Sequence, residues 1–132
     1  MKRIVITGFE PFQKETLNPS RELALSFSKK FETVILPVSY KRAFPELRVH
    51  LGGQAPDFIL MLGQAGGRKW IDLERMAINQ QDAESADEDG DHITQRKISV
   101  EGPDAFLNPL PLRDWAQSLQ REGLPVEISF SA

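Results

Sequence analysis

The sequence contains no cysteine among its 132 residues. Without that residue, neither a disulfide framework nor a zinc site with thiolate ligands can form. The sequence also has no apolar run of the length that a membrane-spanning helix needs. Met1 leads directly into an apolar strand pattern, and no signal-peptide cleavage pattern follows it. We therefore predict a cytoplasmic protein without a membrane partner.

An excess of charge of one sign is missing as well. The 16 Lys and Arg residues nearly balance the 19 Asp and Glu residues, which leaves a net charge of −3. Nucleic acids bind strongly basic surfaces, so we expect no nucleic-acid partner. The two histidines, His50 and His92, each lack a second ligand at a metal-binding spacing. We predict no metal site and no cofactor.

Short apolar runs alternate with amphipathic segments along the chain. The runs predict strands, and apolar residues three and four positions apart predict helices. Strands are expected at residues 4–8, 33–38, 58–62, 71–79 and 126–130, and helices from Asn18, Phe44 and Leu112 onward. An order of strand, helix, strand, helix, strand favours a parallel sheet with right-handed crossovers. We predict a single α/β domain over residues 1–132, of the three-layer α/β/α class with a mostly parallel twisted sheet.

The first candidate site is the loop "GFEPFQKETLNPS", which follows the first strand. Ligands of open α/β sheets bind beyond the carboxyl ends of the strands. Phe9 and Phe12 flank Pro11 at such an end. Two interpretations stay open: the two rings seal the edge of the core, or they form an apolar slot for a flat ligand. Asn18 precedes a proline at a helix start, so capping alone explains its amide.

The second candidate is the glycine-rich loop "GQAGGR" at residues 63–68. Glycines allow backbone N–H groups to converge on a phosphate. However, Arg68 follows Gly67, so the Gly-Lys-Ser/Thr of a nucleotide loop is missing, and the spacing does not match the dinucleotide pattern. A phosphate-binding module built on Gly63–Gly67 is kept as an alternative function.

The third candidate is the stretch "LERMAIN". In one continuous strand, Glu74, Met76 and Ile78 would share a face. If that face is buried, Glu74 is a carboxylate in apolar surroundings, where the charged form is disfavoured. Alternatively, Glu74 and Arg75 form a solvated charge pair at the mouth of the strand.

The acidic stretch "DAESADEDGD" partly matches a calcium-binding loop. Asp87, Asp89 and Gly90 fit that pattern, but Ser85 replaces the first Asp and Arg96 stands where the bidentate Glu belongs. Neither flank has helical periodicity. We therefore predict a solvated acidic loop or irregular hairpin over residues 80–97.

Together these stretches match one known family. The motifs "TGFEPF", "NPS", "GQAGGR", "ERMAIN", "EGPDAF" and "LPL" occur in its order and at about its spacing. The sequence thus resembles pyrrolidone-carboxylate peptidases (pyroglutamyl peptidase I), which remove N-terminal pyroglutamate from peptides. The resemblance implies peptides with N-terminal pyroglutamate as partners and a lactam pocket formed by Phe9, Phe12, Asn18 and Gln64. It also implies that Glu74 is the carboxylate of a Cys-His-acid catalytic arrangement.

The sequence departs from the family pattern at several places. The family's nucleophilic Cys and its His follow the strand that matches residues 126–132, where the given sequence stops. The resemblance thus implies an α/β fold that is incomplete at its C-terminus and catalytically incompetent by itself. Glu84 replaces an Arg of many bacterial members, and Gln13-Lys14 replaces a common Gly-Gly.

An incomplete fold would leave part of its sheet uncovered. We expect open apolar surface at residues 58–62 or 126–130, and therefore marginal stability or a homo-oligomer. A non-catalytic protein that binds pyroglutamyl groups or pairs with another subunit is the remaining alternative.

Overall fold

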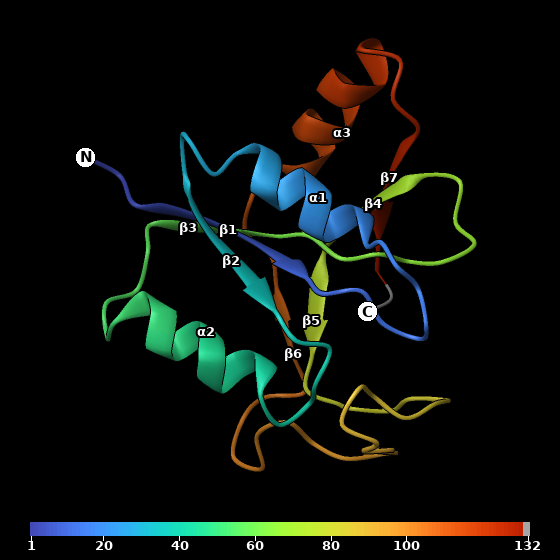
Figure 1. Ribbon diagram of the computed structural model, residues 1–132. Coiled ribbons are helices and arrows are strands. Elements are labelled where there is room, and N and C mark those ends of the chain that lie inside the picture. The colour runs from blue at the N-terminus through green and yellow to red at the C-terminus, as the bar shows by residue number, and fades with distance from the viewer. Residues whose placement is uncertain (131–132) are drawn as a thin grey trace. The chain divides into compact units, whose positions relative to one another are not determined.

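The computed structural model describes residues 1–130 (Figure 1). Within them the chain forms ten elements, in the order β1 (Ile4–Phe9), α1 (Pro19–Ser26), β2 (Glu32–Leu36), α2 (Ala43–Leu51), β3 (Phe58–Met61), β4 (Ile71–Glu74), β5 (Met76–Ile78), β6 (Ala105–Leu107), α3 (Leu112–Arg121) and β7 (Val126–Ser129). They belong to two compact units. The first unit comprises Met1–Ala65 and Glu84–His92, and the second comprises Gly66–Ala83 and the chain from Ile93 onward.

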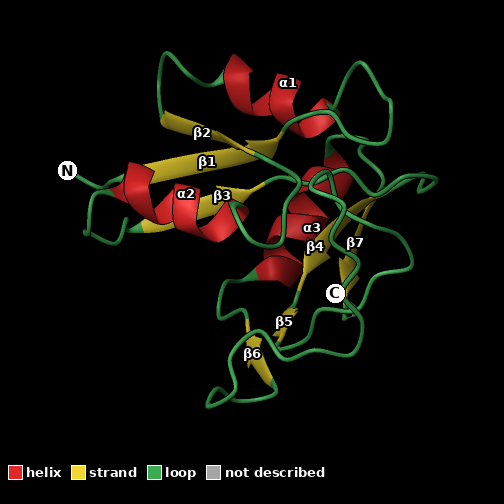
Figure 2. Ribbon diagram, turned by 60° about the horizontal axis from the view of Figure 1, so that its bottom comes forward, coloured by secondary structure: helices red, strands yellow, loops and turns green. Residues whose placement is uncertain are grey.

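The first unit is a parallel sheet with one helix on each face. Its strand order is β2-β1-β3, and both outer strands pair with β1 in the parallel sense. The connection through α1 runs from β1 outward to β2, whereas the connection through α2 runs back across β1 to β3. Because right-handed crossovers in opposite directions place their helices on opposite faces, α1 and α2 enclose the sheet (Figure 2). The predicted α/β class with mostly parallel strands is confirmed.

The residues of β1 alternate between these two faces. Val5 belongs to the core beside α2, where it clusters with Val34, Leu36 and Leu47. Gly8 points to the other face, toward the first turn of α1. A Cβ atom at Gly8 would lie 2.8 Å from the carbonyl carbon of Ser20, closer than non-bonded carbon atoms approach. The glycine therefore allows α1 to start directly against the end of β1.

The helices start close to the predicted positions. α1 begins after Asn18 and α2 ends at Gly52, whose φ of 69° is left-handed. α1 stops at Ser26. Phe31 consequently lies beyond the helix, where its ring contacts that of Phe27 at 6.3 Å between centroids. No helix of the described residues is long and apolar enough to cross a bilayer.

The second unit contains two small sheets. β4 and β7 pair in parallel, and β5 and β6 pair in antiparallel fashion. α3 buries Leu112 and Ala116 and is followed by Gly123, with a φ of 86°, and then by β7. The helix and the terminal strand were both predicted, whereas β6 was not, because it is only three residues long and lies among prolines.

The prediction of one continuous strand over residues 71–79 is wrong. The stretch breaks at Arg75, and its two halves join different sheets. Arg75 donates its backbone N–H to Ser129 O at 2.8 Å, and its guanidinium bonds the carbonyl of Asn108 at 3.0 Å. The strand therefore breaks at the residue that forms hydrogen bonds with two distant parts of the chain, at Ser129 and at Asn108.

Large apolar side chains are exposed in both ranges where open apolar surface was predicted. Met61 in β3 is 71% exposed and Phe130, just after β7, is 64% exposed. Leu60 is also exposed. The assignment of all residues to one domain stays a prediction.

Candidate functional site

The candidate site begins at the carboxyl edge of the first unit's sheet. Phe9 is the last residue of β1, and its half-buried side chain packs against the core cluster beside α2. Phe9 thus covers the edge of the core. Neither interpretation of the Phe9 and Phe12 pair is tested by this contact, so both stay predictions. Phe12 is half-buried three residues further, in the loop of residues 10–18. The structure therefore places both rings in the first unit, one at the end of the strand and one in the loop.

Asn18 closes this loop at its base. Its side chain is almost fully buried, with 1% exposure. The amide oxygen accepts hydrogen bonds from the backbone N–H of Ser20 at 3.0 Å and from the Ser20 hydroxyl at 2.8 Å. The amide nitrogen donates to Glu10 O at 3.2 Å. The predicted capping role is confirmed, and the same amide also joins the two ends of the loop.

Ser20 extends this connection to the strand. Its hydroxyl oxygen accepts a hydrogen bond from the backbone N–H of Phe9 at 3.0 Å. Glu10 N, in turn, donates to Leu36 O of β2 at 2.9 Å. The residues on either side of the loop are therefore held by the sheet and by the first turn of α1.

A tight turn forms the tip of the loop. Glu15 N donates to Phe12 O at 3.1 Å, and the two central residues, Gln13 and Lys14, have φ values of 54° and 64°. Two positive φ values at the central positions are the mark of a type I′ turn, which favours glycine. This geometry explains why a Gly-Gly pair suits the position, and it leaves Gln13 and Lys14 in a conformation that side chains disfavour.

Gln64 lies at the same edge of the sheet as Phe9. The parallel register pairs Thr7 with Met61, and Leu62 N donates to Thr7 O at 3.0 Å, so the ends of β1 and β3 are neighbours. The side chain of Gln64 is exposed. Of the loop glycines, only Gly67 has a positive φ, and it belongs to the second unit. The phosphate-binding alternative gains no support from this backbone.

Glu74 lies in the second unit, at the end of β4 and opposite Ser129 of β7. It is exposed, whereas Met76 and Ile78 are half-buried in another sheet. The predicted shared apolar face is therefore wrong, because the strand breaks at Arg75. The guanidinium of Arg75 bonds backbone carbonyls, so the predicted Glu74–Arg75 charge pair is absent from the described residues.

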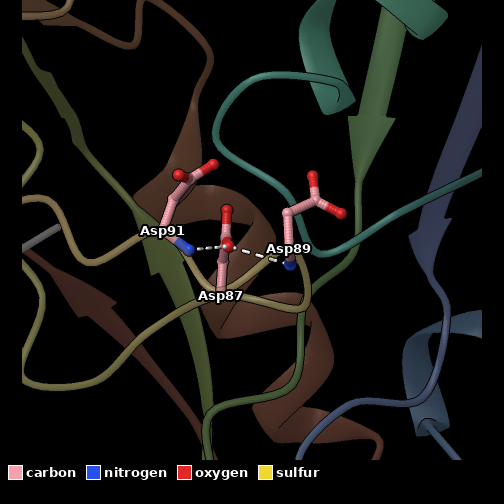
Figure 3. A group of neighbouring side chains, drawn as sticks. All are labelled: Asp87, Asp89 and Asp91. Carbon is pink, nitrogen blue, oxygen red and sulfur yellow. Dashed lines mark hydrogen bonds between the residues drawn. The ribbon is translucent and has the colours of Figure 1, made fainter.

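The acidic stretch is more than a solvated loop. Asp87 accepts three backbone hydrogen bonds. Its Oδ2 accepts from Tyr40 N at 2.8 Å. Its Oδ1 accepts from Asp89 N and Asp91 N at 3.0 and 2.9 Å (Figure 3). These bonds, that from Tyr40 foremost, lower the pKa of Asp87. The prediction of an irregular hairpin is confirmed, because Gln81 and Arg96 form an isolated antiparallel bridge at its base.

Asp89 anchors the same stretch to the start of α2. Its carboxylate accepts two hydrogen bonds from the Arg42 guanidinium, at 3.0 and 2.8 Å, and one from the Ser39 hydroxyl. The Arg42 bonds and then the Ser39 bond lower the pKa of Asp89 to about 2. Because an Arg–carboxylate fork is geometrically specific, this pair fixes the position of the segment.

The three aspartates of the stretch each offer one oxygen within 4.8 Å of the others. Those of Asp87 and Asp89 are already used by N–H and hydroxyl donors, and Asp91 Oδ1 lies 3.1 Å from Lys41 Nζ. The three carboxylates thus bond to groups of the protein itself, and these bonds attach the acidic turn to residues 39–42. The prediction from sequence missed this docking, because the partners Ser39, Tyr40 and Arg42 lie about 50 residues away.

The chain is similar to known proteins along its whole length. Residues 2–132 match the family model described as pyroglutamyl peptidase. The pyrrolidone-carboxylate peptidase of Bacillus thuringiensis (strain Al Hakam) is 38% identical over 138 aligned residues, which cover 100% of this chain and 64% of the relative. That of Bacillus subtilis (strain 168) is 37% identical, with 99% and 64% covered. The chain thus spans about 64% of the length of the curated relatives it matches.

Solved structures show the same likeness. The pyrrolidone carboxyl peptidase of Fervidobacterium islandicum AW-1 superposes with a TM-score of 0.95 at 36% identity, covering 100% of this chain and 66% of that one. The enzyme of Thermococcus litoralis gives a TM-score of 0.93 at 37% identity, with 100% and 63% covered. The matched motifs, the fold and the family model point to one conclusion: the chain belongs to the pyroglutamyl peptidase family.

Proposed function

We propose that the carboxyl edge of the β2-β1-β3 sheet recognises the N-terminal pyroglutamyl group of peptides. The observation that carries this proposal is the loop of residues 10–18, which follows directly on Phe9 at the end of β1, carries the half-buried Phe12 and is closed at its base by Asn18. Pyroglutamate is a neutral five-membered lactam without a free amine. An apolar slot with a few amide contacts suits it, whereas a carboxylate that binds an ammonium group does not.

Each candidate residue has a role in this proposal. Phe9 and Phe12 supply the apolar walls of the slot. Gln64, which is exposed at the neighbouring strand end, supplies an amide that can both donate to the lactam carbonyl and accept from its N–H. Asn18 acts by holding the loop, because its own amide is engaged with Glu10 and Ser20.

The hydrolytic step of the whole enzyme is likewise a proposal for this chain. In it a thiolate attacks the amide carbonyl, a His activates the thiol, and Glu74 orients that His. Residues 1–132 contain no cysteine. Loss of the nucleophile of a catalytic triad costs on the order of 10⁶ in turnover. We therefore expect the polypeptide of these residues to bind pyroglutamyl groups without cleaving them.

Binding is tested by titrating the 132-residue protein with pyroglutamyl amide and with prolyl amide as the matched control. The two ligands share the ring, but prolyl amide carries an ammonium and lacks the lactam carbonyl. Saturable binding of the first and none of the second is expected. Equal affinity for both would overturn the proposal, and so would saturable binding that Phe12→Ala leaves unchanged.

Turnover is tested with a fluorogenic pyroglutamyl amide. None is expected. Signal that thiol-blocking reagents abolish points to a contaminating enzyme, because this polypeptide has no thiol. Signal that survives those reagents contradicts the proposed mechanism.

Self-association through the exposed strands is part of the proposal. Met61 and Phe130 lie open on β3 and beside β7, and exposed apolar surface favours association. A sedimentation profile of a homo-oligomer that Met61→Lys shifts toward monomer is expected, and a monomer at all concentrations contradicts it. The cytoplasmic location and the lack of a cofactor stay predictions.

A further inference from the structure

The segment Glu84–His92 packs as part of the first unit, although the chain on both sides of it belongs to the second. Asp87 and Asp89 dock it onto the turn between β2 and α2, through Tyr40 N and the Arg42 guanidinium. A backbone hydrogen bond from Glu88 N to Val38 O, at 3.0 Å, adds a third point. The Asp89–Arg42 pair is partly exposed, so it contributes little alone. The three contacts together define where the segment lies.

The docked segment contacts the loop of residues 10–18 at its tip. Glu88 Oε1 accepts a hydrogen bond from the backbone N–H of Gln13 at 2.9 Å. The Gln13 side-chain amide donates to Ser85 Oγ at 3.3 Å. Main chain and side chain of a single loop residue are thus both bound by a segment about 70 positions further along the chain.

Gln13 is a residue that needs such support. Its φ of 54° is left-handed, and the turn from Phe12 to Glu15 asks for glycine at that position. A Cβ atom makes this conformation unfavourable, so a glutamine keeps it only where surrounding contacts favour it. Glu88 and Ser85 supply those contacts. The carbonyl of Phe12 accepts the hydrogen bond that closes this turn, so the position of the Phe12 backbone depends on the conformation of Gln13.

We propose that the segment Glu84–His92 is a clamp that holds the tip of the loop in its binding conformation, with Glu88 and Ser85 as positioning residues for Phe12. This inference rests on the proposed function, since the affinity it controls is that for the pyroglutamyl group. Neither residue touches the ligand. Both act through Gln13.

The test compares Glu88→Ala with Glu32→Ala as its matched control. Glu32 is another exposed glutamate of the first unit, bound by the Arg3 fork at 2.9 and 2.8 Å, and the structure gives it no contact with the loop. Two quantities are measured on the ¹⁵N-labelled 132-residue protein. They are the exchange rate of the Gln13 backbone amide and the dissociation constant for pyroglutamyl amide.

Glu88→Ala is expected to accelerate exchange at Gln13 and to weaken ligand binding, each by about tenfold, the size expected for one hydrogen bond to a charged acceptor. Glu32→Ala leaves both unchanged even if it lowers global stability. Glu88→Gln keeps an acceptor oxygen, so it should retain most of the protection of the Gln13 amide and most of the ligand affinity. A purely structural role for Glu88 would not single out Gln13 or be rescued in this way.

The outcomes separate the clamp from the proposed function. If the unaltered protein binds no pyroglutamyl amide, the proposed function fails, while faster exchange at Gln13 in Glu88→Ala still supports the hold on the loop. Unchanged exchange at Gln13 overturns the clamp, and faster exchange with unchanged affinity overturns its role in recognition. Should Glu88→Ala not fold, Ser85→Ala replaces it, and the exchange rate of the Gln13 side-chain amide is measured in place of that of the backbone amide. Unchanged exchange there overturns the clamp.

Discussion

The amide oxygen of Asn18 lies 2.8 Å from the hydroxyl oxygen of Ser20, and that hydroxyl in turn accepts the backbone N–H of Phe9. The cap of α1 and the end of β1 are therefore one hydrogen-bonded chain. A helix cap usually stabilises only its own helix. Here it also sets the position of the loop that carries Phe12, because the other end of the Asn18 amide holds Glu10.

Asn18→Ala removes both functions of this amide. We expect the free energy of unfolding to fall by about 2 kcal/mol, the upper range for a lost cap, because Ser20 also loses its buried acceptor. Urea unfolding measures this change in the free energy of unfolding. Ser26→Ala is the control, since Ser26 lies on the exposed side of the same helix and should change stability by less than about 0.5 kcal/mol. Equal effects of the two substitutions would contradict the double role of Asn18.

Gly8→Ala tests the close approach of α1 to β1. The added methyl group would overlap the carbonyl group of Ser20, and since this is backbone, the helix itself must shift. We expect a loss of about 2–3 kcal/mol, as for overpacked cores. Gly63→Ala is the matched control, because a Cβ at Gly63 meets nothing within 4 Å. Thermal unfolding with similar midpoints for both variants would show that the approach is looser than described.

Lys14→Gly is expected to stabilise the protein. Lys14 has a φ of 64° at the second central position of the type I′ turn, where glycine carries no steric penalty. Removing the strain is worth about 1 kcal/mol, partly offset by the greater freedom of glycine in the unfolded chain. Glu15→Gly, one position further and without a positive φ, should instead destabilise. A loss of stability in Lys14→Gly, measured by urea unfolding, would contradict the turn assignment.

The helix starts and the parallel strands could be predicted from sequence because their signals are local. Asn18 and Pro19 carry a cap and a first helical position within two residues, and Gly52 ends α2 by its own conformation. The break at Arg75 could not be predicted, because it depends on pairing with Ala105–Leu107 and on the carbonyl of Asn108. No pattern within residues 71–79 encodes those partners.

For the candidate site, too, local features could be predicted from sequence and long-range contacts could not. The placement of Phe9 and Gln64 at the carboxyl ends of neighbouring strands could be predicted, since strand ends follow directly from the strands. The docking of Asp87 was missed because an acidic run normally faces water. Its partner Tyr40 lies 47 residues earlier in sequence, and only the folded chain brings a backbone N–H to the carboxylate.

The anchor of the clamp predicts a specific dependence on pH. The Arg42 and Ser39 hydrogen bonds lower the pKa of Asp89 from 3.8 to about 2. A carboxyl group whose pKa is lower in the folded state stabilises the fold at pH values above its unfolded pKa, and that stabilisation is lost as the pH falls toward the folded pKa. The neighbouring charges that face Asp89 are those of Arg42, Lys41 and Asp87, and the pKa of Asp87 is lowered as well.

Asp89→Asn removes this titration. The unaltered protein should be more stable than Asp89→Asn at pH 5, and the difference in their free energies of unfolding should shrink progressively between about pH 4 and pH 2. Glu32→Gln gives a similar decline, because the Arg3 bond lowers the pKa of Glu32 too. Only Asp89→Asn should also accelerate amide exchange at Gln13 at pH 5, since Glu32 has no contact with the clamp. A difference for Asp89→Asn that stays constant from pH 5 to pH 2 would mean that the Arg42 fork does not depend on the charge of Asp89. The segment Glu84–His92 would then be held mainly by Asp87 and the backbone of Glu88.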